Sequence, residues 1–440
     1  MTHDVDVAVI GAGPAGLAAA QAAQDAGART ALVEREDRLG GVLKQCIHDG
    51  FGLMRYGERL TGPEYAWRDE VRLRRNPPRL FMQTFVHAIA ALPAPSGGFR
   101  LTLVNPRDGV FDLTSATLVA ATGCRERTDR QIFVHGDRPA GVFTAGQAQD
   151  YINLRGYLPG RRCVVVGSGD VGLIMARRLT WEGAEVPAVY EIGPEPSGLT
   201  RNVAQCLEDY GIPLHLNSTV TEIRGRDRVE GVTVCPVDRA SQPIRSRAET
   251  VACDAVILSV GLIPENDMLR GLGVEMDPAT GGPTADRWGE TSVPGLFSCG
   301  NALQVSDLVD DVSSEGAVAG NRAARRAARL FAERRDGTAA VGPTILRRRI
   351  RPRGNLRTLV PQVIGGAGID DAGPATFSFR PRRSATTATV KLIQGHRVLD
   401  EARCTWLKPA EMVRLNLNLS SYDPSGPEPE FLVSEAGGPG

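Results

Sequence analysis

The sequence predicts an α/β protein in which one strand–turn–helix–strand unit occurs twice and a small β-rich region follows. The first observation is an apolar run over residues 5–10 that ends on a G-x-G-x-x-G pattern and is followed by an alanine-rich stretch. The second is a repeat of this pattern, in which residues 163–166 lead into another G-x-G-x-x-G at 167–172. The third is a change near residue 341, after which short alternating runs predominate. Alternating strands and helices are typical of α/β architectures.

The first glycine pattern has the features of a dinucleotide site. Gly11 allows a sharp turn off the strand, Gly13 lets a pyrophosphate approach the backbone, and Gly16 allows the helix to pack close to the strand. Pro14 and Ala15 begin the helix. The N-terminus of such a helix presents unpaired N–H groups and a positive dipole end to phosphates.

An acid follows the second strand of each unit. Glu34 comes after the apolar run 29–33, and a carboxylate there can accept hydrogen bonds from a ribose diol. A glycine-rich turn with a purely structural role leaves this acid unexplained. In the second unit the acid is Glu191, although counting from Gly183 places Tyr190 at the position that corresponds to Glu34.

Further elements follow from capping and turn residues. Thr61 is expected to cap a helix that runs to about residue 75, because the residues after it complete a capping box. Another helix is expected over 313–334, and its small residues would let it pack tightly. Gln394-Gly395 is the predicted turn of a hairpin. The chain after Ser421 is expected to be a mobile tail.

Composition argues against several classes of protein. Lys plus Arg and Asp plus Glu are both 51, so no net charge favours nucleic acid or an anionic membrane surface. No apolar run approaches the roughly 20 residues of a membrane span, and the N-terminus lacks a signal-peptide pattern. We therefore expect a cytoplasmic protein. The eight cysteines include no C-x-x-C pair, which indicates reduced thiols and no zinc or iron–sulfur spacing.

The order of five motifs resembles flavoproteins with two dinucleotide-binding domains, related to glutathione and thioredoxin reductases. The motifs are the two glycine patterns, Ala121-Thr122-Gly123, Ser259-Val260-Gly261 and Ser298-Cys299-Gly300-Asn301. A closer resemblance links residues 40–52, 60–66 and 167–178 to bacterial FAD/NAD(P) oxidoreductases. These are similar to flavin subunits of dye-linked proline dehydrogenase, opine oxidase and hydrogen cyanide synthase.

The resemblance implies a glutathione-reductase-like fold with two Rossmann-like dinucleotide-binding domains, the second inserted in the first. Residues 1–125 and 265–340 would form a discontinuous FAD-binding domain, 126–264 the NAD(P)-binding domain, and 341–440 a small β-rich C-terminal domain. The expected cofactor-binding residues are Gly11, Gly13, Pro14, Ala15, Gly16, Glu34, Arg35, Gly40, Gly41, Thr122, Gly123, Gly167, Gly169, Asp170, Gly172, Glu191, Gly261, Gly300, Asn301, Glu315 and Gly316.

The expected cofactors are FAD and NAD(H). NADP(H) is disfavoured because its 2′-phosphate calls for an arginine, whereas Glu191 is acidic and residues 182–200 contain no Arg or Lys. Asn301 departs from the aspartate usual in the family, and its amide can still act as donor and acceptor.

The redox disulfide of the relatives is missing. Aligned on Gly40-Gly41, the two cysteine positions hold Leu43 and His48, so dithiol–disulfide exchange cannot proceed there. Cys46 lies between them, either as a thiol near the flavin or as a buried structural thiol. His48 is either a proton donor near the flavin or a histidine hydrogen-bonded within its loop. Cys46 and His48 are the candidate catalytic residues.

These observations predict an FAD-dependent NAD(P)H oxidoreductase that transfers electrons between NAD(H), bound FAD and an acceptor or partner dehydrogenase subunit. The alternative is a non-catalytic or scaffold flavin subunit of a heteromeric dehydrogenase of the amino-acid, opine or glycerol-3-phosphate type. Retention of both Glu34 and Glu191 favours the first. The expected partners are another dehydrogenase subunit or a second copy, with a small-molecule substrate or electron acceptor. The region 341–440 is expected to serve assembly.

Overall fold

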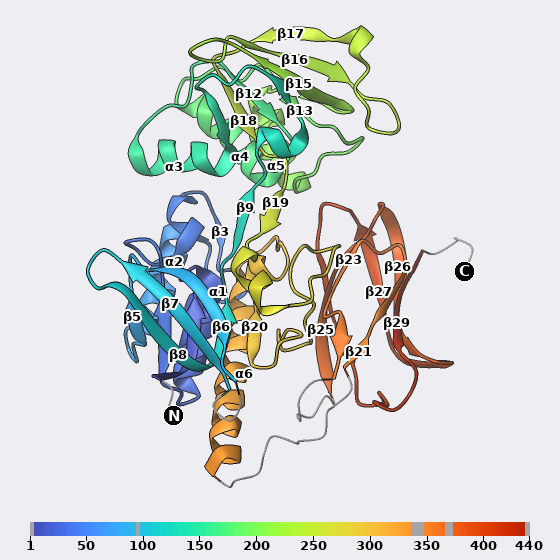
Figure 1. The fold of residues 1–440 in the computed structure, drawn as a ribbon. Coiled ribbons are helices and arrows are strands. Elements are labelled where there is room, and N and C mark those ends of the chain that lie inside the picture. Colours follow the sequence, from blue (N-terminus) through green and yellow to red (C-terminus); the bar gives the residue numbers. More distant parts are fainter. Residues whose placement is uncertain (1–3, 94–96, 336–346, 366–372, 436–440) are drawn as a thin grey trace. The chain divides into compact units, whose positions relative to one another are not determined.

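The chain folds into two compact units in the computed structural model, which describes residues 4–93, 97–335, 347–365 and 373–435. One unit comprises Met1–Cys124 and Pro264–Gly440, and the other Arg125–Ile263 (Figure 1). The chain thus leaves the first unit once and returns to it. Two short strands, β9 (Cys124–Glu126) and β19 (Leu262–Pro264), carry these crossings. The boundary expected at residues 340–341 lies outside the described residues, and the division into three domains stays a prediction.

A seven-stranded sheet forms the centre of the first unit. Central β1 pairs in parallel with β2 on one side and β8 on the other. In spatial order the strands are β5 (Arg79–Phe81), β2 (Thr30–Val33), β1 (Val5–Ile10), β8 (Gly109–Ala120), β7 (Phe99–Asn105) and β6 (Phe85–Ala91), with β20 (Leu296–Ser298) also on β8. β1 is apolar throughout except at Asp6 because both faces of a parallel sheet are covered.

The register of β1 aligns the carboxyl ends of three strands. Ile10 pairs with Val33 of β2 and with Ala120 of β8. The residues that follow, Gly11 and Glu34 among them, therefore emerge at one edge of the sheet. In open α/β sheets ligands bind at this carboxyl edge.

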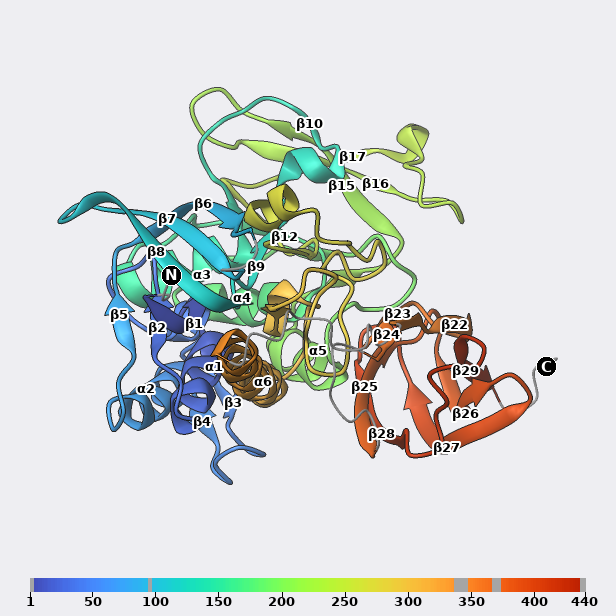
Figure 2. The same cartoon turned by 60° about the horizontal axis from the view of Figure 1, so that its bottom comes forward.

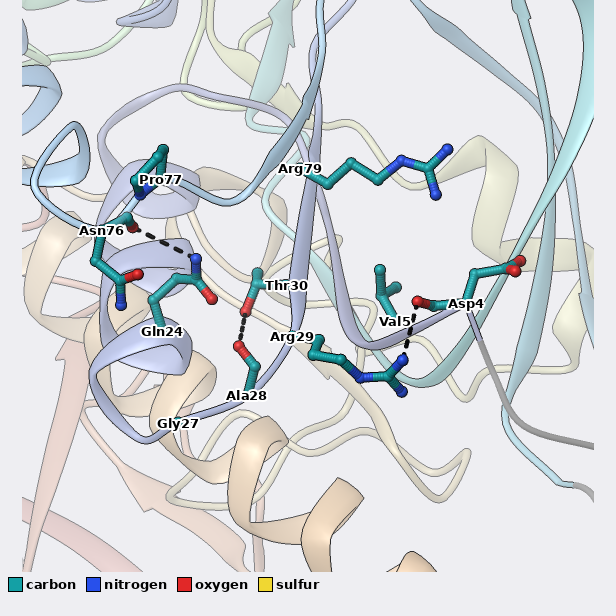
Figure 3. A pocket seen from close by; sticks show the side chains of 10 residues that line it. All are labelled: Asp4, Val5, Gln24, Gly27, Ala28, Arg29, Thr30, Asn76, Pro77 and Arg79. Carbon is teal, nitrogen blue, oxygen red and sulfur yellow. Dashed lines mark hydrogen bonds between the residues drawn. The ribbon is translucent and has the colours of Figure 1, made fainter.

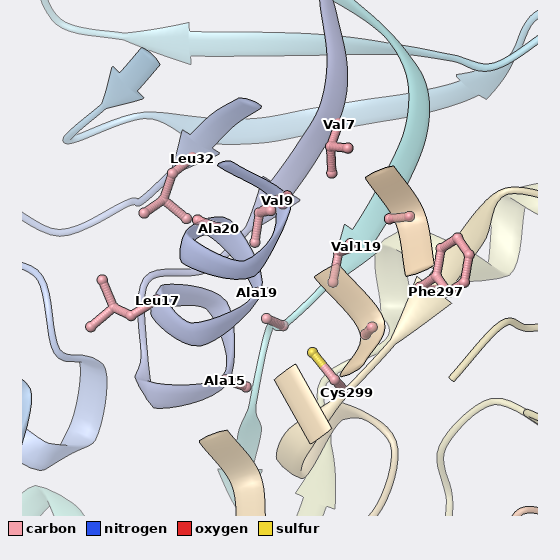
Figure 4. Packing of buried hydrophobic residues seen from close by; sticks show 14 of the residues in the cluster. Val7, Val9, Ala15, Leu17, Ala19, Ala20, Leu32, Val119, Phe297 and Cys299 are labelled. Atoms are coloured by element: carbon pink, nitrogen blue, oxygen red, sulfur yellow. The ribbon is translucent and has the colours of Figure 1, made fainter. Parts of the chain in front are cut away.

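Two helices cover this sheet and contact each other closely, α1 (Pro14–Asp25) and α6 (Val309–Arg335) (Figure 2). A Cβ added to Gly316 would lie 2.1 Å from the carbonyl oxygen of Ala15, and one added to Gly320 would lie 2.0 Å from that of Ala19. Only glycine therefore permits this crossing. Figure 4 shows the buried cluster beneath it, formed by small and branched residues such as Val9, Ala19 and Val119.

Helix α6 begins four residues earlier than expected. The predicted start, Ser313, lies inside the helix, where its hydroxyl accepts a hydrogen bond of 2.8 Å from Tyr65. Asp310 and Asp311 occupy the first turn, where carboxylates interact favourably with the helix dipole. The start at Val309 is thus stabilised by acids whose role the sequence pattern did not reveal.

The predicted helix after Thr61 is confirmed as α2 (Gly62–Leu73). Thr61 accepts from the amide of Glu64, and the Glu64 carboxylate accepts from the amide of Thr61 at 2.8 Å, which completes the capping box. A one-turn 3-10 segment over Gly41–Gln45 and the pair β3 (Asp49–Phe51) and β4 (Leu60–Thr61) precede it.

The second unit contains a five-stranded parallel sheet and a smaller sheet. The parallel sheet has the order β11 (Val142–Thr144), β18 (Ala255–Leu258), β12 (Cys163–Val166), β13 (Val189–Tyr190) and β14 (Leu214–His215). Its helices are α3 (Ala145–Arg155), α4 (Asp170–Trp181) and α5 (Thr200–Cys206). The smaller sheet has the order β10 (His135–Gly136), β15 (Ser218–Arg224), β16 (Gly231–Pro236) and β17 (Glu249–Ala252). β12 leads into α4 as β1 leads into α1.

The C-terminal strands form two larger sheets and one strand pair, with a core that includes Phe377, Phe379 and Phe431. One sheet has the order β22 (Arg351–Gly354), β29 (Pro429–Glu435), β26 (Ala385–Gln394) and β27 (Arg397–Leu407). The other has the order β23 (Thr358–Val360), β25 (Pro374–Arg380) and β28 (Val413–Asn418), and β21 (Arg348–Arg349) pairs with β24 (Val363–Ile364).

Two expectations for this region have different outcomes. The hairpin around Gln394-Gly395 is confirmed, because it joins β26 to β27. The mobile tail after Ser421 is wrong for residues 429–435, which form β29 between β22 and β26. Apolar Phe431 and Val433 hold this strand in the core.

The predicted fold class is confirmed. Each unit contains parallel strands with a glycine-rich strand-to-helix turn, in a mixed sheet in the first unit and a parallel sheet in the second. The second unit is inserted in the first, and a β-rich region follows. Among the helices in the described ranges, none has the length and apolarity needed to cross a membrane.

Candidate nucleotide-binding sites

The three glycines of the first turn meet three different surroundings. Gly11 has a φ of 96°, and an added Cβ would lie 2.4 Å from the carbonyl oxygen of Ala121. A Cβ on Gly16 would lie 1.7 Å from the carbonyl oxygen of Gly11. Gly13, in contrast, has no atom within 4 Å of an added Cβ. The turn and the helix contact thus require Gly11 and Gly16, while Gly13 faces open space.

Helix α1 begins beside this open space. Its N-cap residue is Gly13, which supplies no side chain to cap the first turn, and Pro14 follows. The first amides of a helix have no partners within it. An anion placed next to Gly13 would therefore meet the N–H groups of Ala15 and Gly16 and the positive end of the helix dipole.

We call the open space beside Gly13 and the start of α1 the cradle. Glu34 is fixed at its edge. The carboxylate is buried. Its Oε2 accepts a hydrogen bond of 2.7 Å from the amide of Ala12, and its Oε1 accepts one of 2.9 Å from the amide of Glu36. Each oxygen has a second lone pair, so the carboxylate can hold the turn and still accept from a hydroxyl. Arg35 is exposed beside it.

Glu191 accepts the two equivalent backbone hydrogen bonds in the second unit, and its Oε2 also accepts from the hydroxyl of Ser168 at 2.5 Å. Its Oε2 accepts from the amide of Ser168 at 2.9 Å, and its Oε1 accepts from the amide of Gly193 at 2.9 Å. Val166 pairs with Tyr190, as Ile10 pairs with Val33. Glu191 therefore corresponds to Glu34, and counting from Gly183 pointed to the wrong residue. Tyr190 instead lies in β13, with its ring 5.1 Å from that of His215.

The second glycine turn differs from the first in the surroundings of its middle glycine. A Cβ added to Gly167 would lie 2.2 Å from the carbonyl oxygen of Ser259. A Cβ added to Gly172 would lie 2.4 Å from the Cβ of Ser259. At Gly169 an added Cβ would lie 2.9 Å from the Ser259 hydroxyl, whereas the corresponding position at Gly13 is open. Gly261, which follows Ser259, has a φ of 106°.

A loop after β13 is fastened to this turn. Asp170, the first residue of α4, accepts from the amide of Leu199 at 2.8 Å and from the side-chain amide of Asn202 at 2.6 Å. Ser197 donates its amide to the Ser168 hydroxyl at 2.9 Å and its own hydroxyl to Glu191 at 3.0 Å. Ser197, in the loop, and Asn202, in α5, escaped the sequence analysis, because no fixed spacing marks a later residue that folds back on a turn.

The remaining predicted residues of the first unit surround the same cradle or brace it. Gly40 donates its amide to the carbonyl oxygen of Ala12 at 2.8 Å, and a Cβ on Gly41 would lie 2.9 Å from the Cα of Gly13. Thr122 donates its hydroxyl to the carbonyl oxygen of Glu265 at 2.6 Å. Gly123 accepts from the amide of Glu265 at 2.9 Å.

The turn at Gly300 closes the cradle near the start of α1. Gly300 has a φ of 61°, and an added Cβ would lie 2.8 Å from the Cβ of Ala15. Its amide donates to Glu315 Oε2 at 3.2 Å. Asn301 accepts from the amide of Ser306 at 3.0 Å and contacts Cys124 Sγ at 3.5 Å. The structure therefore brings Gly300 and Gly316 against Ala15, with Glu315 bonded to Gly300.

Burial changes the protonation of Glu315. Desolvation raises the pKa of this carboxyl to about 7, although Arg414 opposes the shift, with its Nη1 3.5 Å from Glu315 Oε1. Neighbouring Asp311 raises it further, and the amide of Gly300 lowers it.

Cys46 has the surroundings of a structural thiol. Its Sγ donates to the carbonyl oxygen of Val42 at 3.3 Å, and its own carbonyl accepts from the amide of Gly62 at 2.8 Å. Burial raises the pKa of the thiol to about 12. The thiolate is the reactive form of cysteine, so this setting favours the structural interpretation. All eight cysteines are free thiols.

His48 and Leu43 lie on either side of Cys46 in the chain. The ring of His48 is 5.0 Å from that of Phe51, at an interplanar angle of 47°. Leu43 is buried with Leu60 and Tyr65. The binding and catalytic roles of all these residues stay predictions.

Comparison with known proteins agrees with this geometry. Residues 5–319, well over half of the chain, match the family described as pyridine nucleotide-disulphide oxidoreductase. The chain belongs to this family. Pyridine nucleotide-disulphide oxidoreductases are flavin-dependent, and members bind FAD and NAD(P).

Two curated relatives of this chain differ in activity. The chain is 27% identical over 316 residues to hydrogen cyanide synthase subunit HcnB of Pseudomonas protegens, and this alignment covers 67% of the chain and 65% of that protein. The chain is 26% identical over 347 residues to the mitochondrial dihydrolipoyl dehydrogenase of Cricetulus griseus, and this alignment covers 72% of the chain and 65% of that relative. The chain thus spans less than two thirds of the length of either relative.

Two solved structures share the fold of this chain. Thioredoxin reductase of T. acidophilum aligns with a TM-score of 0.60 at 22% identity, covering 74% of this chain and 99% of that one. L-proline dehydrogenase of P. horikoshii aligns with a TM-score of 0.53 at 21% identity, and the alignment covers 76% of this chain and 58% of that one.

A further pocket lies away from the cradle (Figure 3). It is lined by residues at the amino ends of β1 and β2 and by the segment before β5, among them Val5, Thr30 and Asn76. Arg29, also in its wall, forms an ion pair with Asp6 at 2.6 Å. Nucleotides in this architecture bind at the opposite, carboxyl edge of the sheet, so this pocket is not a nucleotide site.

Proposed function

We propose that the protein is an FAD-dependent oxidoreductase that transfers electrons between NAD(H), FAD bound in the first unit, and an acceptor or partner dehydrogenase subunit. The observation that carries the proposal is the equivalence of Glu34 and Glu191, each fixed beside a glycine turn by two backbone amides. Two such sites suit one flavin dinucleotide and one nicotinamide dinucleotide. When bound, FAD would supply the redox chemistry.

The first unit offers the groups that FAD needs. The pyrophosphate would lie over Gly13, where no protein atom stands within 4 Å of an added Cβ, and would meet the amides at the start of α1. Glu34 would accept from the ribose of the adenosine half. Gly41 and Gly300 line the same cradle and bring the backbone close to the dinucleotide.

The second unit favours NAD(H) over NADP(H). Glu191 would accept from the 2′- and 3′-hydroxyls of the adenosine ribose and would repel a 2′-phosphate. Residues 182–200 contain no arginine or lysine to neutralise that phosphate. Asp170 would keep the loop around Leu199 next to the nucleotide.

Electron transfer in this protein would proceed without a protein dithiol. The two positions that hold cysteines in disulfide-reducing relatives hold Leu43 and His48, and Leu43 is buried among apolar side chains. Cys46 would remain protonated, because burial raises the pKa of its thiol to about 12. The acceptor is therefore a small molecule or another protein.

A partner subunit is part of the proposal. The relative from Pseudomonas protegens is named as a subunit of hydrogen cyanide synthase, and by analogy this chain would assemble with another dehydrogenase subunit or with a second copy of itself. A cytoplasmic location would fit the use of NAD(H).

One observation favours a second candidate, a non-catalytic or scaffold flavin subunit of a heteromeric dehydrogenase. Gly169 faces the Ser259 hydroxyl, where Gly13 faces open space, and the loop around Ser197 is bonded to the same turn. If these contacts keep a nucleotide from the second glycine turn, only the first unit would hold a cofactor.

Anaerobic absorption spectroscopy of the FAD-loaded full chain separates the two candidates. The proposal expects NADH to bleach the flavin band, and faster than NADPH does. Bleaching by a reduced partner or organic substrate but by neither nicotinamide would favour the scaffold candidate. Faster reduction by NADPH would contradict the role given to Glu191.

A further inference from the structure

An arginine of the C-terminal strands reaches the start of α6. Arg414, on β28, places Nη1 3.0 Å from Asp311 Oδ1 and 3.5 Å from Glu315 Oε1. Asp311 and Glu315 are four residues apart and lie on one face of the helix. The three side chains are largely withdrawn from solvent, with exposed fractions of 20%, 18% and 15%.

Glu315 also contacts the cradle of the first unit. Its other oxygen, Oε2, accepts from the amide of Gly300 at 3.2 Å. Gly300 in turn packs so closely on Ala15 that an added Cβ would lie 2.8 Å from the alanine Cβ. A continuous series of contacts thus runs from Arg414 through Glu315 and Gly300 to the N-terminal turn of α1.

A second pair of contacts holds the segment between the Gly300 turn and α6. Arg380, at the end of β25, forms an ion pair with Asp307 and donates to the carbonyl oxygen of Val305 at 3.3 Å. Asp307 also accepts from the amide of Met412 at 2.6 Å. On the other side, Asn301 accepts from the amide of Ser306. Arg380 of β25 and Met412, just before β28, therefore hold this segment at Val305 and Asp307, close to the start of α6.

We propose that Arg414 is a positioning residue of the first nucleotide site, through which the C-terminal strands hold the Gly300 turn against α1. This goes beyond the assembly role expected for residues 341–440, because the strands then contribute to the cofactor site. That the ligand is FAD rests on the proposed function.

The physical reason is the desolvated carboxylate of Glu315. Removing one partner of a buried ion pair leaves an uncompensated charge, which is strongly unfavourable. Without Arg414, Glu315 would take up a proton or turn toward water. Either response weakens the bond from the Gly300 amide, since a neutral or displaced carboxyl is the poorer acceptor.

Three variants of the full chain test this. Arg414→Ala removes both contacts. Arg414→Lys keeps the charge but replaces the planar fork by a single ammonium, which serves two acids less well. Arg383→Ala is the matched control, because Arg383 forms an exposed ion pair of 2.8 Å with Glu435 within the same C-terminal sheets.

Two measurements are made on each variant. The first is amide hydrogen exchange at residues 299–303 of the flavin-free protein, and the second is the dissociation constant for FAD. Arg414→Ala should speed exchange and raise the dissociation constant roughly 2- to 30-fold, the range expected for residues that act through a contact network. Arg414→Lys should fall between Arg414→Ala and wild type, and Arg383→Ala should match wild type.

Three outcomes would overturn the proposal. They are unchanged exchange at residues 299–303 in Arg414→Ala, unchanged FAD affinity despite faster exchange, and equal changes in Arg383→Ala. If Arg414→Ala does not fold, Arg414→Lys provides the same comparison. A wild-type chain that binds no FAD would contradict the proposed function, while exchange at Gly300 would still decide whether Arg414 positions the turn.

Discussion

Glu191 accepts a hydrogen bond from the amide of Ser168 in the second unit, and Glu34 accepts the equivalent bond from Ala12 in the first. In both units the donor is the residue between the first two glycines of the turn. A second bond comes from the amide two residues beyond the acid, Glu36 or Gly193. Each acid therefore braces its own glycine turn, and in the proposed function it would also accept hydrogen bonds from a nucleotide ribose.

The first prediction contrasts two glycines of one turn. Gly13→Val should leave the flavin-free protein folded, because an added Cβ meets no atom within 4 Å, yet it should abolish FAD binding by blocking the pyrophosphate. Gly16→Ala should destabilise the fold itself, because its Cβ would lie 1.7 Å from the carbonyl oxygen of Gly11. Thermal unfolding and FAD titration of both variants check this. A Gly13→Val protein with wild-type FAD affinity would refute the placement of the pyrophosphate.

The second prediction concerns the choice of nicotinamide nucleotide. Glu191→Gln removes the charge that would repel a 2′-phosphate and should lower the NADH-to-NADPH ratio of flavin reduction rates, by roughly tenfold for a contribution of about 1.4 kcal/mol. Stopped-flow reduction under anaerobic conditions measures the ratio. Glu195→Gln, an exposed acid of the same loop, should leave the ratio unchanged. An unaltered ratio in Glu191→Gln would argue against the ribose contact.

The third prediction is that Cys46 takes no part in electron transfer. Because burial raises the pKa of its thiol to about 12, only about one molecule in 10⁴ would carry a thiolate at pH 8. Alkylation of Cys46 should be at least about 100-fold slower in the folded than in the unfolded protein. Cys46→Ser should retain NADH-driven flavin reduction. Disulfide reductase activity that disappears in Cys46→Ser would contradict this interpretation.

The fourth prediction is a pH dependence of stability that originates at Asp286. Burial, reinforced by Glu290, raises the pKa of this carboxyl from 3.8 to about 7, against the opposing charge of Arg347. Between about pH 4 and 7 the folded protein therefore keeps a proton that the unfolded chain releases. The free energy of unfolding should fall as pH rises through this window, by at most on the order of 4 kcal/mol from this group.

Asp286→Asn should flatten that dependence, because asparagine does not titrate. Chemical unfolding at several pH values between 4 and 8 compares it with wild type and with Glu401→Gln, an exposed acid on β27. Glu315 contributes a slope of the same sign, because the pKa of its carboxyl is also raised, so some dependence should remain. Parallel curves for Asp286→Asn and wild type would rule out the assignment to Asp286.

Local patterns predicted the parts of the site that depend on local geometry. Gly11 has a positive φ, Gly16 lies against Gly11, and the capping box at Thr61 spans three residues. Backbone constraints within a few residues fix these features, so the sequence reveals them. Glu191 was located by its place after a strand, but counting residues failed because the segment between Gly183 and β13 differs in length from its counterpart.

Contacts between distant segments could not be predicted in this way. Arg414 and Glu315 are 99 residues apart, and nothing in either local sequence specifies the other. The strand β29 was mistaken for a mobile tail because the Pro- and Gly-rich residues before it, 423–428, are typical of turns. Its pairing with β26 and β22 depends on strands far away in the sequence.

Titration of the flavin-free full chain with FAD tests the central claim most directly. The geometry of the first unit predicts one tight site per chain, which is lost in Gly13→Val while that variant keeps the wild-type unfolding temperature. A wild-type chain that takes up no FAD, or one in which Gly13→Val binds FAD as wild type does, would contradict the claim that the first glycine turn is a flavin site.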